Sequence, residues 1–229
     1  LFNRDLFRDK FFLFFFVLNL SISLTGLVGI ENFKAAFTDS ISGRAREIAG
    51  SDLSISGRRP LESEKLQVLL NEIEPILYSR KVSFFSMGNS SKISKLVRIS
   101  EFDPSFPYYG SREYAPQIDH LNKDEVILYK STAQSFDLKL GDQFKIGSKA
   151  FKIVSLVIKD SSETFDMGQI APKVLMSKSG ISWGEFLSIG STAFHSIYFK
   201  TSQSITESLK NKLIDIIDDT SIRVRTMND

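Results

Sequence analysis

The sequence predicts an α+β protein: a membrane helix followed by a two-layer α/β sandwich, into which a small, mostly-β subdomain is inserted. Three observations lead to this prediction. Phe11 to Ile30 carries no charged residue, which separates a membrane segment from the rest of the chain. A strand–helix–strand pattern then occurs near each end of the remainder. Between these patterns, residues 103–192 hold most of the prolines and several short β-like runs.

The uncharged run of twenty residues lies between Lys10 and Glu31. About 20 helical residues are needed to cross the hydrocarbon core of a bilayer. The alternative is a secretory signal peptide, with a basic start and an apolar core of about 7–15 residues. The core here is longer, and Lys34-Ala35-Ala36-Phe37 is a poor cleavage site. We therefore favour an uncleaved membrane helix.

One side of this helix is predicted to carry small and polar residues. Asn19, Ser23 and Gly26 follow at positions i, i+4 and i+7, so they share a helical face. Such faces let neighbouring membrane helices approach closely and form hydrogen bonds. We expect this face to pack against other membrane helices, the alternative being that the three residues are spaced so by chance.

The first strand–helix–strand pattern follows a helical continuation over residues 31–49. A strand is predicted at Asp52–Gly57, because polar and apolar residues alternate there. Pro60 is placed to begin a helix, and Pro75 to bend or end it. Two strands follow, at Lys81–Met87 and Ile93–Phe102. The residues predicted to form the apolar face of this helix are Leu66, Leu69, Leu70, Ile73, Ile76 and Leu77.

The second pattern begins with a strand at Ala193–Lys200. Ser204 and Glu207 match the S-x-x-E capping box, which predicts that a helix begins at Ser204. Ile222 and Val224 alternate with arginines and predict a last strand. The apolar face predicted for the helix consists of Ile205, Leu209, Leu213, Ile216 and Ile217. Folded together, the two patterns form a sheet with helices on one face.

The middle region is predicted to be a separate, mostly-β subdomain. Gly147-Ser148-Lys149 forms a hairpin turn between two β-like runs. The predicted strands are Val126–Tyr129, Gln143–Ile146, Phe151–Ile158 and Pro172–Met176.

The sequence gives little support for enzymatic chemistry. It contains neither the phosphate loop G-x-x-x-x-G-K-[ST] nor the dinucleotide motif G-x-G-x-x-G. Gly180 to Gly184 matches the nucleophile elbow G-x-S-x-G around Ser182. That fold needs an acid and then a histidine after the serine. Only Glu185 and His195 follow in that order, and the thirteen residues from Ser182 to His195 cannot hold the intervening elements. We reject the hydrolase interpretation.

Composition excludes other classes. A net charge of +2 gives no basic surface typical of nucleic-acid binding, and the absence of cysteine excludes disulfides and thiol nucleophiles. His120 and His195 lack metal-ligand spacing, so we predict no metal site. The acidic cluster Asp215, Asp218 and Asp219 is interpreted as a solvated helix end, with a cation site as the alternative.

Three aromatic residues are candidates for a ligand or partner surface. Phe165, Trp183 and Phe186 lie in the loop-rich part of the inserted region. The alternative, which we favour, is that they are buried in the small β core. Glu163 and Asp166 flank Phe165, but no partner residue supports an acid–base pair there.

Several segments, in their order along the chain, resemble YbbP-like ABC transporter permeases of the FtsX/MacB group. Gly50 to Leu61 resembles the segment after the first membrane helix of that family. Phe106-Pro107-Tyr108-Tyr109-Gly110 is similar to its Y-P-L-Y-G element, and Leu138 to Asp142 to its L-x-L-G-D hairpin. Gly168 to Met176 matches the stretch that follows. The chain departs from the pattern at Val126–Tyr129 and from Ser191 onward.

This resemblance implies a periplasmic domain behind the first helix of an inner-membrane permease. Residues 1–32 would form the cytoplasmic flank and membrane helix, 33–104 and 193–229 a porter-like α+β lobe, and 105–192 the inserted β subdomain. The resemblance implies further membrane helices after Asp229 and a non-catalytic permease without a cofactor of its own. ATP would be hydrolysed by a separate cytoplasmic subunit, and a periplasmic thioesterase/lysophospholipase is a suggested partner.

Two functional hypotheses follow. The first is a permease domain that couples ATP hydrolysis to the extraction or export of hydrophobic or lipid-like compounds, by transmitting motion across the membrane. The second is a single-pass, membrane-anchored binding or sensor domain on the extracytoplasmic side.

Overall fold

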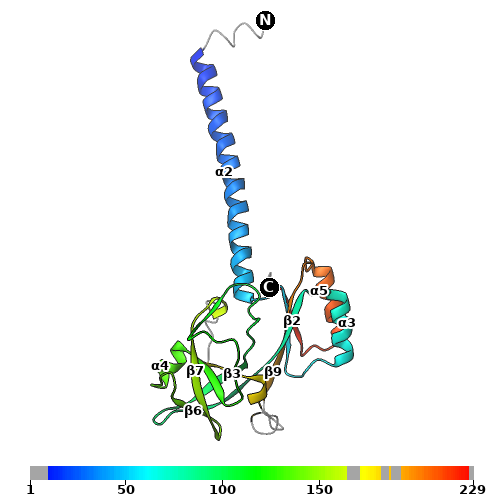
Figure 1. The fold of residues 1–229 in the computed structure, drawn as a ribbon. Coiled ribbons are helices and arrows are strands. Elements are labelled where there is room, and N and C mark those ends of the chain that lie inside the picture. Colours follow the sequence, from blue (N-terminus) through cyan, green and yellow to red (C-terminus); the bar gives the residue numbers. More distant parts are fainter. Residues whose placement is uncertain (1–9, 164–170, 182–185, 187–191, 227–229) are drawn as a thin grey trace. The chain divides into compact units, whose positions relative to one another are not determined.

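A computed structural model gives the fold of the chain (Figure 1). It describes residues 10–163, 171–181, 186 and 192–226. The chain divides into two compact units, Leu1–Arg44 and Ala45–Asp229. The first contains most of a long helix, and the second contains the sheet and the remaining helices.

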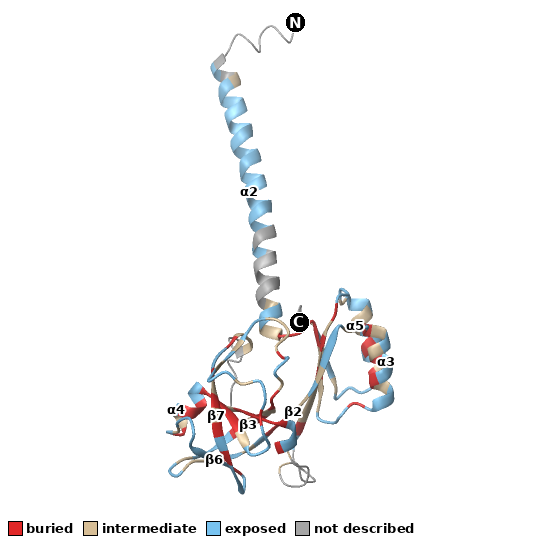
Figure 2. Ribbon diagram, viewed as in Figure 1, coloured by how far each residue is buried: buried red, intermediate tan, exposed pale blue. Residues whose placement is uncertain are grey.

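Helix α2 runs without interruption from Lys10 to Ala49. Within it, Leu13–Lys34 is long and apolar enough to cross a membrane, and its most apolar stretch is not buried by any other part of the described chain. Figure 2 shows this exposure along the helix. The predicted apolar helix and its continuation over residues 31–49 are therefore both helical, as expected.

In the part of the second unit that the structure describes, ten strands form one sheet with the order β10-β1-β9-β2-β3-β8-β5-β7-β4, and β6 pairs with β2 and β7. Most neighbours are antiparallel, whereas β3 with β8 and β5 with β7 are parallel. The strands are β1 (Leu53–Gly57), β2 (Leu77–Asn89), β3 (Ser94–Glu101), β4 (Arg112–Ala115), β5 (Glu125–Tyr129), β6 (Gln143–Ile146), β7 (Lys149–Asp160), β8 (Lys173–Met176), β9 (Ala193–Lys200) and β10 (Arg223–Thr226).

Helices α3 (Ser63–Ile73) and α5 (Glu207–Ile217) lie side by side (Figure 1) and share a core with β1 and β9. This arrangement confirms the predicted α+β class and the sandwich at the two ends of the domain. The side chains that fill the core are Leu53, Ile55, Leu61, Leu66, Leu69, Ile73, Ile197, Phe199, Leu213 and Ile217.

The prediction that the helix ends at Pro75 is confirmed, but its apolar face was predicted to run two residues too far. α3 ends at Ile73, and Glu74 adopts the left-handed conformation (φ 45°) that closes the helix. Ile76 and Leu77 are therefore exposed and do not extend the apolar face. The reason is a tertiary contact: Ile76 donates a backbone hydrogen bond to the Lys200 carbonyl, which starts the pairing of β2 with β9.

The predicted capping box at Ser204 was also wrong. The N-cap of α5 is Thr206, whose hydroxyl accepts a hydrogen bond from the Leu209 amide at 3.2 Å. The residues before Thr206 are held by contacts outside the helix. Gln203 donates to the Thr201 hydroxyl and to the Ile73 carbonyl, so the helix cannot begin until the chain leaves these contacts.

A second core lies among β2, β3, β5, β6, β7 and β8. It combines Phe84, Val97 and Ile99 of the first strand–helix–strand pattern with residues of the middle region. The short helix α4 (Lys130–Ser135), strand β4 and the 3-10 turns Ser161–Glu163 and Lys178–Gly180 complete the described elements. The predicted boundary of the inserted subdomain falls between residues 104 and 105, but strands from both sides of it share one sheet and one core. The boundaries of an inserted subdomain therefore stay a prediction.

Candidate functional site

The last turn of α2 is fastened to the sheet through one buried carboxylate, Asp52. Its Oδ2 accepts a hydrogen bond from the Tyr109 hydroxyl at 2.7 Å and from the Thr201 amide at 2.9 Å. Arg46, on α2, approaches its Oδ1 at 3.7 Å and lies 5.7 Å from the centre of the Tyr109 ring. Burial and the hydrogen bond to Asp52 raise the pKa of Tyr109 to about 12.

We call this group of Arg46, Asp52, Tyr109 and Thr201 the junction. It joins α2, the segment before β1, the loop at Phe106–Gly110 and the end of β9. Gly50 strengthens it, because its amide bonds the Arg46 carbonyl and its own carbonyl accepts from Tyr108. Two of the segments on which the family resemblance rests, Gly50–Leu61 and Phe106–Gly110, therefore meet at one point.

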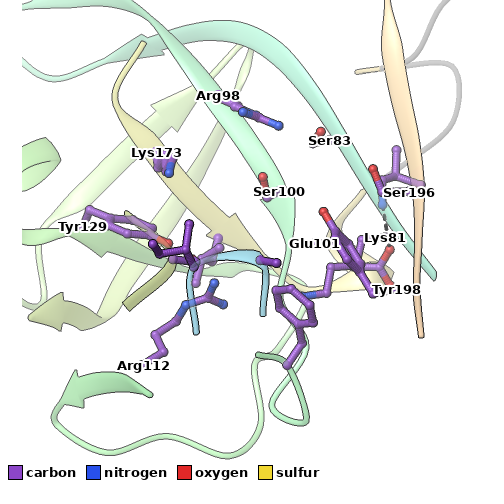
Figure 3. Close-up of a pocket in the computed structure, with 16 residues that line it drawn as sticks. Lys81, Ser83, Arg98, Ser100, Glu101, Arg112, Tyr129, Lys173, Ser196 and Tyr198 are labelled. Atoms are coloured by element: carbon purple, nitrogen blue, oxygen red, sulfur yellow. Dashed lines mark hydrogen bonds between the residues drawn. The ribbon is translucent and has the colours of Figure 1, made fainter. Parts of the chain in front are cut away.

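A cavity of about 220 Å³ lies beside the junction (Figure 3). Its walls come from β2, β3, β8 and β9, together with β4, Phe106 and the end of α2. Four basic side chains and one acidic side chain face it, accompanied by four serines. These are Lys81, Arg98, Arg112, Lys173, Glu101, Ser83, Ser100, Ser162 and Ser196.

Arg112 is fixed in the cavity wall by a buried ion pair. Its Nε lies 2.8 Å from Oδ2 of Asp160, and the Tyr129 hydroxyl donates to the same oxygen at 2.6 Å. The amide and hydroxyl of Ser162 donate to the other carboxylate oxygen. The pKa of Asp160 is lowered: burial alone would raise it, but the charge of Arg112 and these hydrogen bonds outweigh burial.

Lys81 is held by aromatic rings. Its Nζ lies 3.4 Å from the centre of the Phe106 ring and 5.5 Å from that of Tyr198. Burial and the charge of Arg112 lower the pKa of Lys81 to about 7, although Asp103, Glu101 and Asp160 act in the opposite direction. Both the charged and the neutral form of Lys81 are therefore present near pH 7.

Glu101 closes the cavity where β2 and β3 separate. Pairing of these strands begins at Ser83 and Ser100, so the Val82 amide has no β3 carbonyl and donates to the Glu101 carboxylate at 3.3 Å instead. Burial raises the pKa of Glu101. The cavity thus has two groups, Lys81 and Glu101, whose charged forms are disfavoured by their surroundings.

Replacing Lys81 with methionine is expected to change how stability depends on pH. The folded-state pKa near 7 lies below the ordinary value of 10.5, so between these values the unfolded chain binds more protons. The wild-type protein therefore gains stability as pH rises from 7 towards 10, with a slope of up to about 1.4 kcal/mol per pH unit. Lys81→Met lacks this gain, so its stability relative to wild type should fall over the same range. Unfolding measured at several pH values tests this, and a pH-independent difference would contradict it.

The structure leaves the predicted aromatic surface untested. Phe165 and Trp183 lie outside the described residues. Phe186 is half-buried and packs on the core, with its ring centre 5.9 Å from that of Phe84 and 6.2 Å from that of Phe151. The predicted packing face of α2 stays a prediction. Asn19 and Ser23 border a shallow hollow on the helix together with Phe15, Phe16 and Leu20.

The predicted acidic cluster lies at the C-terminal end of α5. Asp218 ends α5 in the left-handed conformation, and the Asp219 carboxylate accepts hydrogen bonds from Ser221. His195 lies on β9, where burial and Arg80 lower its pKa, and His120 is exposed between β4 and β5. Within the described residues, no group of three histidine or acidic side chains could hold a metal. Ser182, Glu185, Asp166 and the side chain of Glu163 lie outside the description.

Sequence reasoning did not identify the junction or the cavity. The residues of both are distant in sequence, and each is an ordinary type at an ordinary position. One signal was present: Arg98 and Lys173 are basic residues inside predicted strands whose neighbours are apolar, as in Val97-Arg98-Ile99.

Comparison with known proteins supports the resemblance. No family model matches the chain. The chain is 22% identical over 166 residues to the uncharacterized ABC transporter permease YbbP of Escherichia coli (strain K12). That match covers 72% of this chain and 20% of the permease, so the chain spans about a fifth of the relative's length.

Two solved structures share the fold. The periplasmic region of MacB from Actinobacillus actinomycetemcomitans superposes with a TM-score of 0.51 at 10% identity, covering 80% of this chain and 92% of that one. The extracellular domain of the ABC-type transporter YknZ from Gram-positive bacteria also gives 0.51, at 8% identity, over 76% of this chain and all of the other.

The second unit thus shares the fold of the periplasmic region of MacB and of the extracellular domain of the ABC-type transporter YknZ. In sequence the chain is similar to YbbP, and the predicted resemblance to the FtsX/MacB group is confirmed.

Proposed function

We propose that this chain is the first helix and extracytoplasmic domain of a non-catalytic, inner-membrane permease. It couples ATP hydrolysis by a separate cytoplasmic subunit to the extraction or export of hydrophobic or lipid-like compounds. The similarity to YbbP supports the permease class, and the helix Leu13–Lys34 supports a membrane anchor. The observation that carries the mechanism is the junction: one uninterrupted helix, Lys10–Ala49, ends in it.

Transmission of motion needs a stiff element with a fixed end. A continuous α-helix supplies the stiffness, since every internal backbone amide is bonded within it. The junction supplies the fixed end, because a shift of Arg46 or Gly50 is passed to Asp52, to the Phe106–Gly110 loop and to Thr201, which directly follows β9. The thioesterase/lysophospholipase partner and the absence of a bound cofactor remain predictions of the family resemblance.

Insertion of Gly-Ser between Ala35 and Ala36 should uncouple transport from ATP hydrolysis without unfolding the domain. Glycine is about 1 kcal/mol less favourable than alanine in a helix, so the insertion softens α2 between the membrane segment and the junction. The measurement is ATP-driven transfer of a fluorescent single-chain lipid from proteoliposomes to albumin, with the full-length permease and its ATPase subunit.

An Ala-Ala insertion at the same point is the matched control. It adds the same length and rotation but keeps the helix stiff, so it should retain more transfer than Gly-Ser. Equal transfer by wild type and the Gly-Ser variant would overturn the mechanism. If the chain were an anchored sensor, ATP-driven transfer would be missing in the wild type as well.

A further inference from the structure

One face of the sheet carries both the basic cavity and an exposed apolar area. Side chains alternate between the faces of a strand. On β2, Lys81 and Ser83 therefore share a face with Phe85 and Met87. On β3, Arg98 and Ser100 share the corresponding face with Leu96, since Ser83 pairs with Ser100 and Phe85 with Arg98.

The strand register places the two areas in direct contact. Arg98 is the cross-strand partner of Phe85 on one side and of Lys173 on the other. The next pair along the same face is Met87 with Leu96. Phe85, Met87 and Leu96 are 39%, 45% and 43% exposed, and the Phe194 ring meets Phe85 edge-on at 6.3 Å between centres. We call Phe85, Met87, Leu96 and Phe194 the apolar strip.

Basic residues gather on one side of this face. Arg98 and Lys173 are register partners on the parallel strands β3 and β8, so these two cations are neighbours. Four basic residues face the cavity against Glu101. Of the nearby acids, Asp160 binds Arg112, and Asp103 and Glu101 act on Lys81. An anionic ligand would be attracted to the neighbouring cations Arg98 and Lys173.

We propose that this face binds a single-chain amphiphile with a phosphate headgroup, with the phosphate at Arg98 and Lys173 in the cavity and the chain along the apolar strip. The proposal rests on the function proposed above and names its substrate class. A guanidinium can bind a phosphate with two hydrogen bonds, and the cavity serines add hydroxyl donors. The cavity volume of about 220 Å³ suits a headgroup, whereas the strip lies open beside it.

The experiment measures binding of alkyl phosphates to the chain in phosphatidylcholine nanodiscs by calorimetry, with empty nanodiscs as the reference. The probes are inorganic phosphate, hexyl phosphate and octyl phosphate, with octyltrimethylammonium as the cationic analogue. Affinity should rise about two- to fourfold per methylene as the chain covers apolar surface. The cationic analogue should show no binding above the empty nanodisc.

Four variants separate the two halves of the site. Arg98→Gln should weaken the binding of octyl phosphate at least tenfold. Its control is Arg80→Gln, which makes the same charge change at an exposed position on β2 whose side chain points to the other face. Arg80→Gln should not weaken this binding. Leu96→Ser should weaken octyl phosphate but not inorganic phosphate. Leu140→Ser, at a leucine of similar exposure (49%) near the β6–β7 hairpin, is its control.

Each other outcome overturns the proposal in a defined way. Equal affinity for phosphate and octyl phosphate would assign a free-anion site. Binding that depends on chain length but is unaffected by Arg98→Gln would show that the amphiphile binds elsewhere. If no alkyl phosphate binds, the apolar strip would be assigned to contact with a protein partner instead. None of these results bears on ATP-driven transfer, so failure here is distinguishable from failure of the permease function.

Discussion

Replacing Asp52 with alanine is expected to destabilise the domain by about 3 kcal/mol and to abolish ATP-driven lipid transfer. The substitution leaves the buried Thr201 amide and the Tyr109 hydroxyl without their acceptor, and it removes the charge that faces Arg46. An unsatisfied buried polar group costs about 1–3 kcal/mol. Denaturant unfolding measures the first effect, and transfer from proteoliposomes to albumin measures the second.

A variant of matched stability isolates the role of the junction. Leu69→Ala, in the core between α3 and the sheet, should cost about 2–5 kcal/mol without touching the junction. If stability alone mattered, both variants would lose transfer equally. We expect Leu69→Ala to keep most of it at a temperature where both are folded. Tyr109→Phe, which removes one hydrogen bond, should fall between wild type and Asp52→Ala.

Replacing Asp160 with alanine should be the most destabilising single change at the cavity, by about 3–5 kcal/mol. Asp160 and Arg112 are almost fully buried, with side chains 1% and 8% exposed. Removing one partner of a buried pair leaves an uncompensated charge. The Tyr129 hydroxyl and the Ser162 amide lose their acceptor as well. Thermal and denaturant unfolding measure the loss.

The double variant Arg112→Met with Asp160→Leu is the control for this mechanism. Apolar residues of similar size often replace a buried ion pair at little cost, so the double variant should recover much of the stability lost in Asp160→Ala. A double variant no more stable than Asp160→Ala would show that the hydrogen bonds to Tyr129 and Ser162, rather than the buried charge, dominate.

Local patterns predicted the elements well where one face of an element is buried. The apolar periodicity of α3 and α5 and the alternation of β7 are direct consequences of packing against a single core. Element ends were predicted less well. Ser204 has the sequence of a cap, but tertiary hydrogen bonds at Thr201 and Gln203 delay the helix to Glu207.

The site itself depends on pairing between distant strands, which no local pattern contains. Arg98 and Lys173 meet only because β3 pairs in parallel with β8, and Asp52 meets Thr201 only because β1 lies beside β9. β4 was not predicted either, because its sequence Arg-Glu-Tyr-Ala does not alternate between polar and apolar residues and its pairing with β7 is irregular. The order of the motifs along the chain was enough to predict the family resemblance, whereas the site could be recognised only from the pairing of the strands.

The pairing of β1 with β10 determines which forces the domain withstands. Leu53, the first residue of β1, is paired with Thr226, the last of β10, so the chain enters and leaves this strand pair at the same end. A force pulling the two points apart would open the ladder one hydrogen bond at a time, as a zipper opens. A force that displaces Leu53 and Thr226 together puts no load on the hydrogen bonds between β1 and β10. The β1–β10 ladder therefore withstands a common displacement of Leu53 and Thr226 better than a force that pulls these two residues apart.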